Sequence, residues 1–125
     1  MSELRTDTIT ASDGTSPVTL TGQSAAKAWV NFNGTGTIAT RGSLNVSGLL
    51  DDGTGDYTIS FSNTMANVNY SATGAVNQNE TTGVLDFSLQ GTQAVGSVKV
   101  ASHITSSYTR SDGQIVCTSI HGDLA

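Results

Sequence analysis

Two glycines, Gly34 and Gly36, lie in the segment of the chain that comes nearest to a ligand-binding motif. Residues 34–39 read Gly-Thr-Gly-Thr-Ile-Ala, which fits the G-x-G-x-x-G/A pattern that cradles the pyrophosphate of a dinucleotide. The pattern binds phosphate only where a strand leads into a helix, because the helix N-terminus must face the phosphates. Residues 37–46 contain strand formers and a further glycine but no amphipathic helical period. We therefore predict a hairpin turn at these glycines and no nucleotide.

Three carboxylates, Asp51, Asp52 and Asp56, surround a Gly-Thr-Gly turn and are the strongest candidates for a metal site. Calcium binds flexible loops that are rich in oxygen ligands. The segment lacks the D-x-[DN]-x-[DN]-G spacing and the distal bidentate Glu of the EF-hand loop. A solvated hairpin tip is therefore the expected structure, and we predict no metal there.

Histidine, cysteine and acidic residues do not combine into a catalytic set in the sequence. His103 and His121 form no HxH or HExxH pattern, and Cys117, the single cysteine, has neither a CxxC partner nor an internal disulfide. A small carbohydrate-acting enzyme, the remotest alternative, needs a carboxylate pair. Asp86 and Glu80 are the candidates for such a pair, and no other feature of the sequence supports them. We expect no enzymatic activity, no catalytic residue and no cofactor.

The composition argues against several classes of partner. Of the 125 residues, 12% are charged and 36% are hydrophobic, and the net charge is −5. The five Lys and Arg residues are scattered singly, whereas duplex nucleic acid and anionic membranes are bound by basic clusters. No apolar run approaches the roughly 20 residues of a membrane-spanning helix, and the N-terminal residues lack the apolar segment of a signal peptide. We expect neither nucleic-acid binding nor membrane insertion.

Alternating apolar and polar residues indicate strands in many parts of the chain. Residues 57–62, 84–89 and 115–120 each alternate with period two, as half-buried strands do. Asn-Gly and Asp-Gly pairs favour tight turns, and the 19 Thr residues favour strands over helices. We predict an all-β fold: an antiparallel β-sandwich or jelly-roll-like knob of about eight to ten short strands. The knob is expected to span residues 25–125, after an extended N-terminal arm at residues 1–24.

Three segments in the first half of the chain carry a resemblance to a known protein family. They are Lys-Ala-Trp-Val-Asn-Phe at residues 27–32, Gly-Thr-Gly-Asp-Tyr at residues 53–57 and Met-Ala-Asn-Val-Asn-Tyr at residues 65–70. In this order and spacing they resemble a domain of the tail-fibre-like and virion decoration proteins of tailed bacteriophages. The resemblance covers about residues 24–75, and the start of the chain, Leu-Arg-Thr-Asp-Thr-Ile at residues 4–9, is similar to the start of such proteins.

The resemblance implies a structural component of the virion exterior, commonly trimeric and without enzymatic activity. Two roles stay open. One is a tail-fibre knob that binds a host-surface glycan or protein, and the other is a capsid decoration protein or head fibre that stabilises the phage head. In either role, the N-terminal arm is expected to bind other tail or capsid proteins, and the chain is expected to be made in the host bacterial cytoplasm.

Candidate contact residues are chosen by their place in loops and by side-chain size. Loops on a rigid scaffold are the usual place for receptor contacts, and Tyr and Arg are frequent anchors at interfaces. The receptor candidates are Asn77, Asn79, Glu80, Tyr108 and Arg110. Strands with an apolar residue on each face need cover on both faces. We therefore expect Trp29 and Phe32 to lie at the interface of a homotrimer.

Overall fold

The computed structural model describes residues 2, 9–10, 12, 14, 25–77 and 83–125. Within these ranges the chain forms eight strands and no helix, and hence no helix that is long and apolar enough to cross a membrane. The predicted arm, residues 1–24, lies almost entirely outside the described residues and stays a prediction. The strands are β1 (Ala28–Asn33), β2 (Ala39–Leu44), β3 (Val46–Gly53), β4 (Asp56–Phe61), β5 (Ser71–Val76), β6 (Leu85–Ala94), β7 (Ser97–Ile104) and β8 (Val116–His121).

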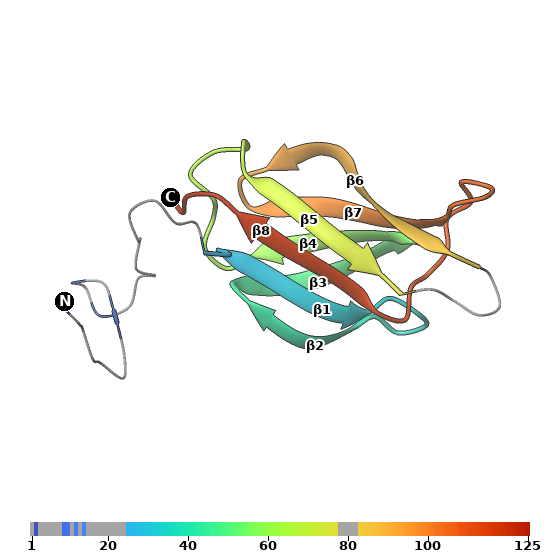
Figure 1. The fold of residues 1–125 in the computed structure, drawn as a ribbon, viewed down its shortest axis with the longest axis horizontal. Helices are drawn as coiled ribbons and strands as arrows, with labels where there is room; N and C mark the ends of the chain where they lie inside the picture. Colours follow the sequence, from blue (N-terminus) through green and yellow to red (C-terminus); the bar gives the residue numbers. More distant parts are fainter. Residues whose placement is uncertain (1, 3–8, 11, 13, 15–24, 78–82) are drawn as a thin grey trace.

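The strands form two four-stranded sheets that pack face to face (Figure 1). Sheet A has the strand order β2-β1-β8-β5, sheet B has the order β3-β4-β7-β6, and every pair of neighbours is antiparallel. Three pairs of consecutive strands form hairpins, namely β1–β2, β3–β4 and β6–β7, while the other connections pass from one sheet to the other. The predicted antiparallel β-sandwich is confirmed.

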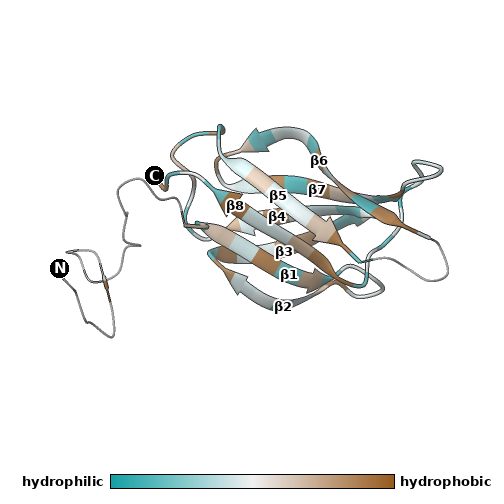
Figure 2. Cartoon of the chain, viewed as in Figure 1, coloured by the Kyte–Doolittle hydropathy of each residue, from teal (hydrophilic) through white to brown (hydrophobic). Residues whose placement is uncertain are grey.

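The core lies between the sheets and is built by the alternation seen in the sequence. In β1, Ala28, Val30 and Phe32 point inward and are at most 2% exposed, whereas Trp29 between them points outward and is 41% exposed. Figure 2 shows the result as short hydrophobic bands that alternate with polar ones along the strands. The buried cluster consists of Ala28, Val30, Phe32, Tyr57, Ile59, Phe61, Met65, Tyr70, Val98, Val100, Val116 and Ile120.

The sandwich has two distinct ends. Ala28 pairs with Ile120 and Phe32 pairs with Val116, so β1 begins where β8 finishes. At this first end, called the arm end, the chain enters β1 and the C-terminal residues pair with the β4–β5 connection through a Met65–Leu124 bridge. The opposite end, called the loop end, carries the connections at residues 34–38, 54–55 and 105–115 (Figure 1). Any attachment made through the residues before β1 would therefore lie at the opposite end of the sandwich from these loops.

Candidate functional site

The Gly34–Gly36 segment joins β1 to β2 as a hairpin at the loop end, so the predicted turn is confirmed. Gly36 has a φ of 62°, which a glycine adopts without steric cost. Gly34 is required for a different reason. A side chain there would overlap the Tyr57 hydroxyl and lie 2.9 Å from the Gly113 carbonyl oxygen. The two glycines thus serve a turn and a close approach between loops.

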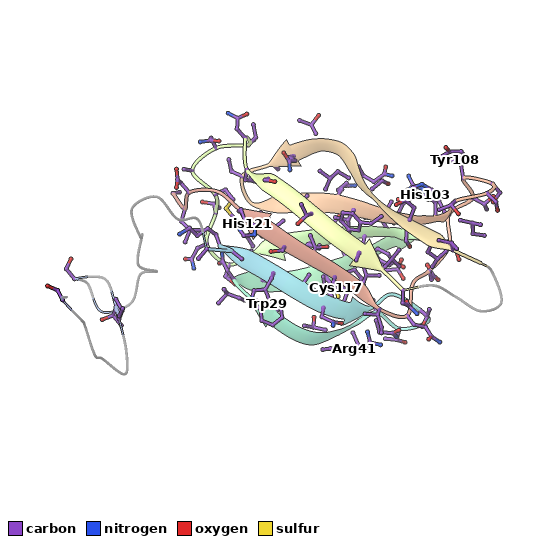
Figure 3. The ribbon with its side chains drawn as sticks, viewed as in Figure 1. Trp29, Arg41, His103, Tyr108, Cys117 and His121 are labelled. Carbon is purple, nitrogen blue, oxygen red and sulfur yellow. The ribbon has the colours of Figure 1, made fainter. Side chains whose placement is uncertain are left out.

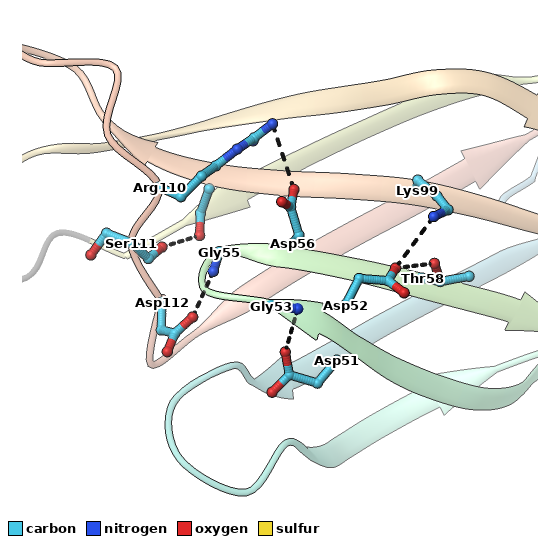
Figure 4. A network of polar contacts seen from close by, with 11 residues as sticks. Asp51, Asp52, Gly53, Gly55, Asp56, Thr58, Lys99, Arg110, Ser111 and Asp112 are labelled. Carbon is cyan, nitrogen blue, oxygen red and sulfur yellow. Dashed lines mark hydrogen bonds and ion pairs between the residues drawn. The ribbon is translucent and has the colours of Figure 1, made fainter.

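Asp112 ties the connections of the loop end together (Figure 4). Its Oδ1 accepts hydrogen bonds from the N–H of Gly55, at 2.6 Å, and from the Tyr57 hydroxyl, at 3.2 Å. The Tyr57 hydroxyl also lies 3.1 Å from the carbonyl oxygen of Gly34, whose own N–H donates to the Gly113 carbonyl at 2.9 Å. The β1–β2, β3–β4 and β7–β8 connections are therefore held as one unit.

Tyr57 keeps its proton in this network. Burial, and after it the negative charge of Asp112, raises the pKa of the Tyr57 hydroxyl from 10.0 to about 12. A neutral hydroxyl can donate a hydrogen bond, whereas a phenolate can only accept one. The link between the loops accordingly persists through neutral pH.

The three carboxylates of the β3–β4 hairpin face three different partners (Figure 4). Asp51 accepts a hydrogen bond from the backbone N–H two residues further on, at 3.0 Å. Asp52 lies 3.6 Å from the Lys99 ammonium group, and Asp56 lies 3.5 Å from the Arg110 guanidinium group. In the part of the chain that the structure describes, no group of three or more His, Cys, Asp or Glu residues could hold a metal ion.

Tyr108 forms the exposed tip of the β7–β8 connection. His103 at the end of β7 pairs with Arg110, and the N–H of Tyr108 closes the turn on the Ile104 carbonyl at 2.8 Å. The Tyr108 side chain is stacked on the His103 ring, with centroids 5.8 Å apart, and the residue is 81% exposed (Figure 3). Its φ of 55° is unusual for a bulky residue, and such strained positions concentrate at functional sites.

The other receptor candidates differ in what their side chains do. Arg110 is half-buried and pairs with Asp56, and the Asn77 Oδ1 accepts a hydrogen bond from the Ile115 N–H at 2.7 Å. Both belong to the loop end, where each links neighbouring segments. The candidates Asn79 and Glu80 lie outside the described residues, so their roles, and the carboxylate pair of Glu80 with Asp86, stay predictions.

Trp29 belongs to a surface on the outside of sheet A (Figure 3). Its ring lies over Gly42 of β2, where a Cβ would meet ring carbons at 3.3 Å. Beside it is a shallow depression of about 460 Å³. The outward residues that line this surface, called the Trp29 face, are Trp29, Asn31, Thr73, Ala75, Cys117 and Ser119. None of them is charged.

Phe32, the second residue expected at the subunit interface, is fully buried in the interior of its own sandwich. It packs edge-on against Tyr57, with ring centroids 5.1 Å apart. Its parity along β1 is that of Val30 and opposite to that of Trp29, so the two expected interface residues lie on opposite sides of sheet A. Of the two residues, only Trp29 lies on the outside of the sandwich, where a contact with another subunit is possible.

The histidines and the cysteine are not brought together. His103 lies at the loop end of sheet B beside Asp86, whose Oδ2 is 3.9 Å from its Nε2. His121 lies at the arm end of sheet A, where its Nε2 is 3.2 Å from the Ser119 hydroxyl, and Cys117 is a half-buried free thiol near the start of β8.

The central role of Asp112 was missed by sequence reasoning. The pair Asp112-Gly113 indicates a turn, which is the usual meaning of Asp-Gly. Its carboxylate instead serves a backbone N–H 57 residues earlier in the chain, and no local pattern encodes that contact. Comparisons with family models, with curated proteins and with solved structures found no match for the chain.

Proposed function

We propose that the chain is a structural protein of a tailed-bacteriophage virion, an exterior β-knob that attaches the particle to the host surface. The observation that carries this proposal is the separation of the two ends. The chain enters the sandwich at the arm end, and the loops held by Asp112 lie at the opposite end (Figure 1). A rigid scaffold that holds its loops away from its tether is suited to surface recognition.

The same proposal includes a homotrimer that buries the Trp29 face. A large apolar ring in an uncharged surface of small side chains favours association, since monomeric proteins seldom leave large apolar patches exposed. The choice of three subunits is taken from the resemblance to the tail-fibre-like proteins, which are commonly trimeric.

Competition for adsorption tests the attachment role. Host cells are incubated with the purified full-length chain before phage particles are added, and free phage is counted over time. We expect the adsorption rate to fall at least about tenfold at saturating protein. Unchanged adsorption would contradict host attachment and would favour capsid decoration, in which the protein acts only on the particle.

A further inference from the structure

A strip of polar side chains runs along the outer face of sheet B, from Tyr108 at the loop end toward the middle of the sheet. We propose that this strip binds an uncharged oligosaccharide on the host surface, with Tyr108 as the ring on which one sugar stacks. The proposal rests on the attachment function proposed above and names the chemical class of its ligand.

Tyr108 supplies the stacking surface. One side of its ring lies on His103 with 20° between the planes, which leaves the other side open to solvent. The side chain of His103 is only 13% exposed, so the base of the stack is held by the sheet. Aromatic rings of this kind contact apolar surface with their faces while the hydroxyl stays hydrated, which suits the C–H face and hydroxyl rim of a pyranose.

Hydrogen-bonding groups flank the platform. The carboxylate of Asp86 is 61% exposed next to His103, and the pair Asp56–Arg110 lies between this point and the middle of the sheet. Carboxylates and guanidinium groups can accept from and donate to sugar hydroxyls at the same time. The groups come from three segments, β4, β6 and the β7–β8 connection, all of them fixed by strand pairing.

The strip continues to a small polar pocket of about 140 Å³. Asp52, Gln90 and Lys99 are among its lining residues, and the register places Gln90 opposite Lys99. Lys99 and His103 are on the same side of β7, four residues and therefore about 13 Å apart at ~3.3 Å per residue. The strip is thus long enough for an oligosaccharide rather than for a single sugar.

The charges of the strip favour an uncharged ligand. The strip has two permanent cations, Lys99 and Arg110, each within 3.6 Å of a carboxylate, and three carboxylates, Asp52, Asp56 and Asp86. The unpaired excess on the strip is negative, which opposes uronic acids, sialic acids and phosphorylated glycans. The core of a protein–protein interface is depleted of charged residues, whereas the strip carries Asp52, Asp56, Asp86, Lys99 and Arg110.

Binding of defined oligosaccharides to the full-length chain tests the proposal. The probes are maltotetraose, cellotetraose and N-acetylchitotetraose, with tetragalacturonic acid as the acidic comparison, and amide chemical shifts give the affinities. Tyr108→Asn removes the ring and retains a residue that tolerates positive φ, so the loop keeps its shape. Tyr108→Phe retains the ring. Val95→Asn, at an exposed apolar residue between β6 and β7 at the arm end, is the matched control.

We expect at least one neutral probe to bind, with shifts at His103 and Tyr108, and Tyr108→Asn to weaken its affinity about tenfold or more. Tyr108→Phe and Val95→Asn should stay within about twofold of the parent chain. Absence of binding by all three neutral probes overturns the proposal. So does equal binding by the Tyr108→Asn chain, or binding of the acidic probe alone. If the parent chain still competes for adsorption in any of these cases, the attachment function stands and only the ligand class is wrong.

Discussion

At the scale of single residues, Tyr57 has two roles that a sequence pattern cannot separate. Its ring fills the core against Phe32, and its hydroxyl reaches the end of the sandwich, where Asp112 and the Gly34 carbonyl accept from it. The ring explains why the residue is 1% exposed, and the hydroxyl explains why position 34 must be glycine. Tyr57 therefore couples the core to the loops.

Tyr57→Phe tests the contribution of the hydroxyl. The ring is retained, so the core stays filled, but Asp112 loses one donor in a partly buried position. We expect the free energy of unfolding to fall by about 1.5–3 kcal/mol, the range for hydrogen bonds to charged groups. Denaturant unfolding monitored by tryptophan fluorescence measures the change. Tyr108→Phe, at an exposed tip, is the matched control and should change stability by less than about 0.5 kcal/mol.

The raised pKa of Tyr57 predicts a dependence of stability on alkaline pH. The folded state holds the proton more tightly than the unfolded state, whose pKa is near 10.0. The corresponding stability is fully present below pH 10 and is lost as the pH rises through about 12. Thermal unfolding between pH 9 and pH 12 should show a steeper loss for the parent chain than for Tyr57→Phe. Parallel curves for the two chains would contradict a raised pKa of Tyr57.

At the scale of elements, β5 has a glycine at position 74 because Phe87 of the opposite sheet fills the space beneath it. A Cβ at Gly74 would overlap the ring of Phe87 in β6 and lie 2.6 Å from the Cys117 carbonyl oxygen in β8. Gly48 in β3 offers a contrast, since a Cβ there would meet nothing within 4 Å. Glycine is needed at the first position and not at the second.

Gly74→Ala should destabilise the sandwich by about 1–3 kcal/mol, since an added methyl group in a filled interior forces its neighbours to move. Gly48→Ala, in an exposed bulge, should lie within about 0.5 kcal/mol of the parent chain. Urea unfolding of the two variants side by side measures both values. Equal stability of the two would show that β5 does not pack on Phe87 as described.

The alternation of apolar and polar residues predicts some of the strands and not others. β4 and β8 overlap residues 57–62 and 115–120, where the alternation predicted strands. In β1 the inward side was not predicted, since Phe32 was expected at the subunit interface and is buried. β2 and β5, with the sequences ATRGSL and SATGAV, have too few large side chains to show a period, and both lie at the edges of sheet A. The pairing of the sheets and the Asp112 contacts depend on residues distant in sequence, so no local pattern reveals them.

At the scale of the whole molecule, the Trp29 face and the outer face of sheet B differ in charge. Sheet B carries paired charges such as Asp52–Lys99, whereas the Trp29 face carries none. In the proposed trimer the uncharged face is buried and the charged face meets solvent and ligand. In the same proposal the loop end points away from the particle, and the N-terminal arm, residues 1–24, is expected to bind the virion.

Trp29→Ser tests the assembly. We expect light scattering to give about 38 kDa for the parent, the mass of three 12.8-kDa chains, and the mass of a single chain for the variant. Loss of the ring removes the largest apolar contact from the buried face. Val68→Ser is the matched control, because Val68 is 42% exposed but lies in the β4–β5 connection at the arm end. A parent chain that is monodisperse at 12.8 kDa would contradict the trimer.

The central claim, that the chain is an exterior virion protein, is tested most directly by counting its copies in purified phage particles. Quantitative mass spectrometry against a labelled standard gives the number per particle, and antibody labelling in the electron microscope gives the place. The account predicts a small multiple of three copies at the tail. A number on the scale of the capsid lattice would assign the chain to decoration of the head, and absence of the chain from purified particles would contradict the account.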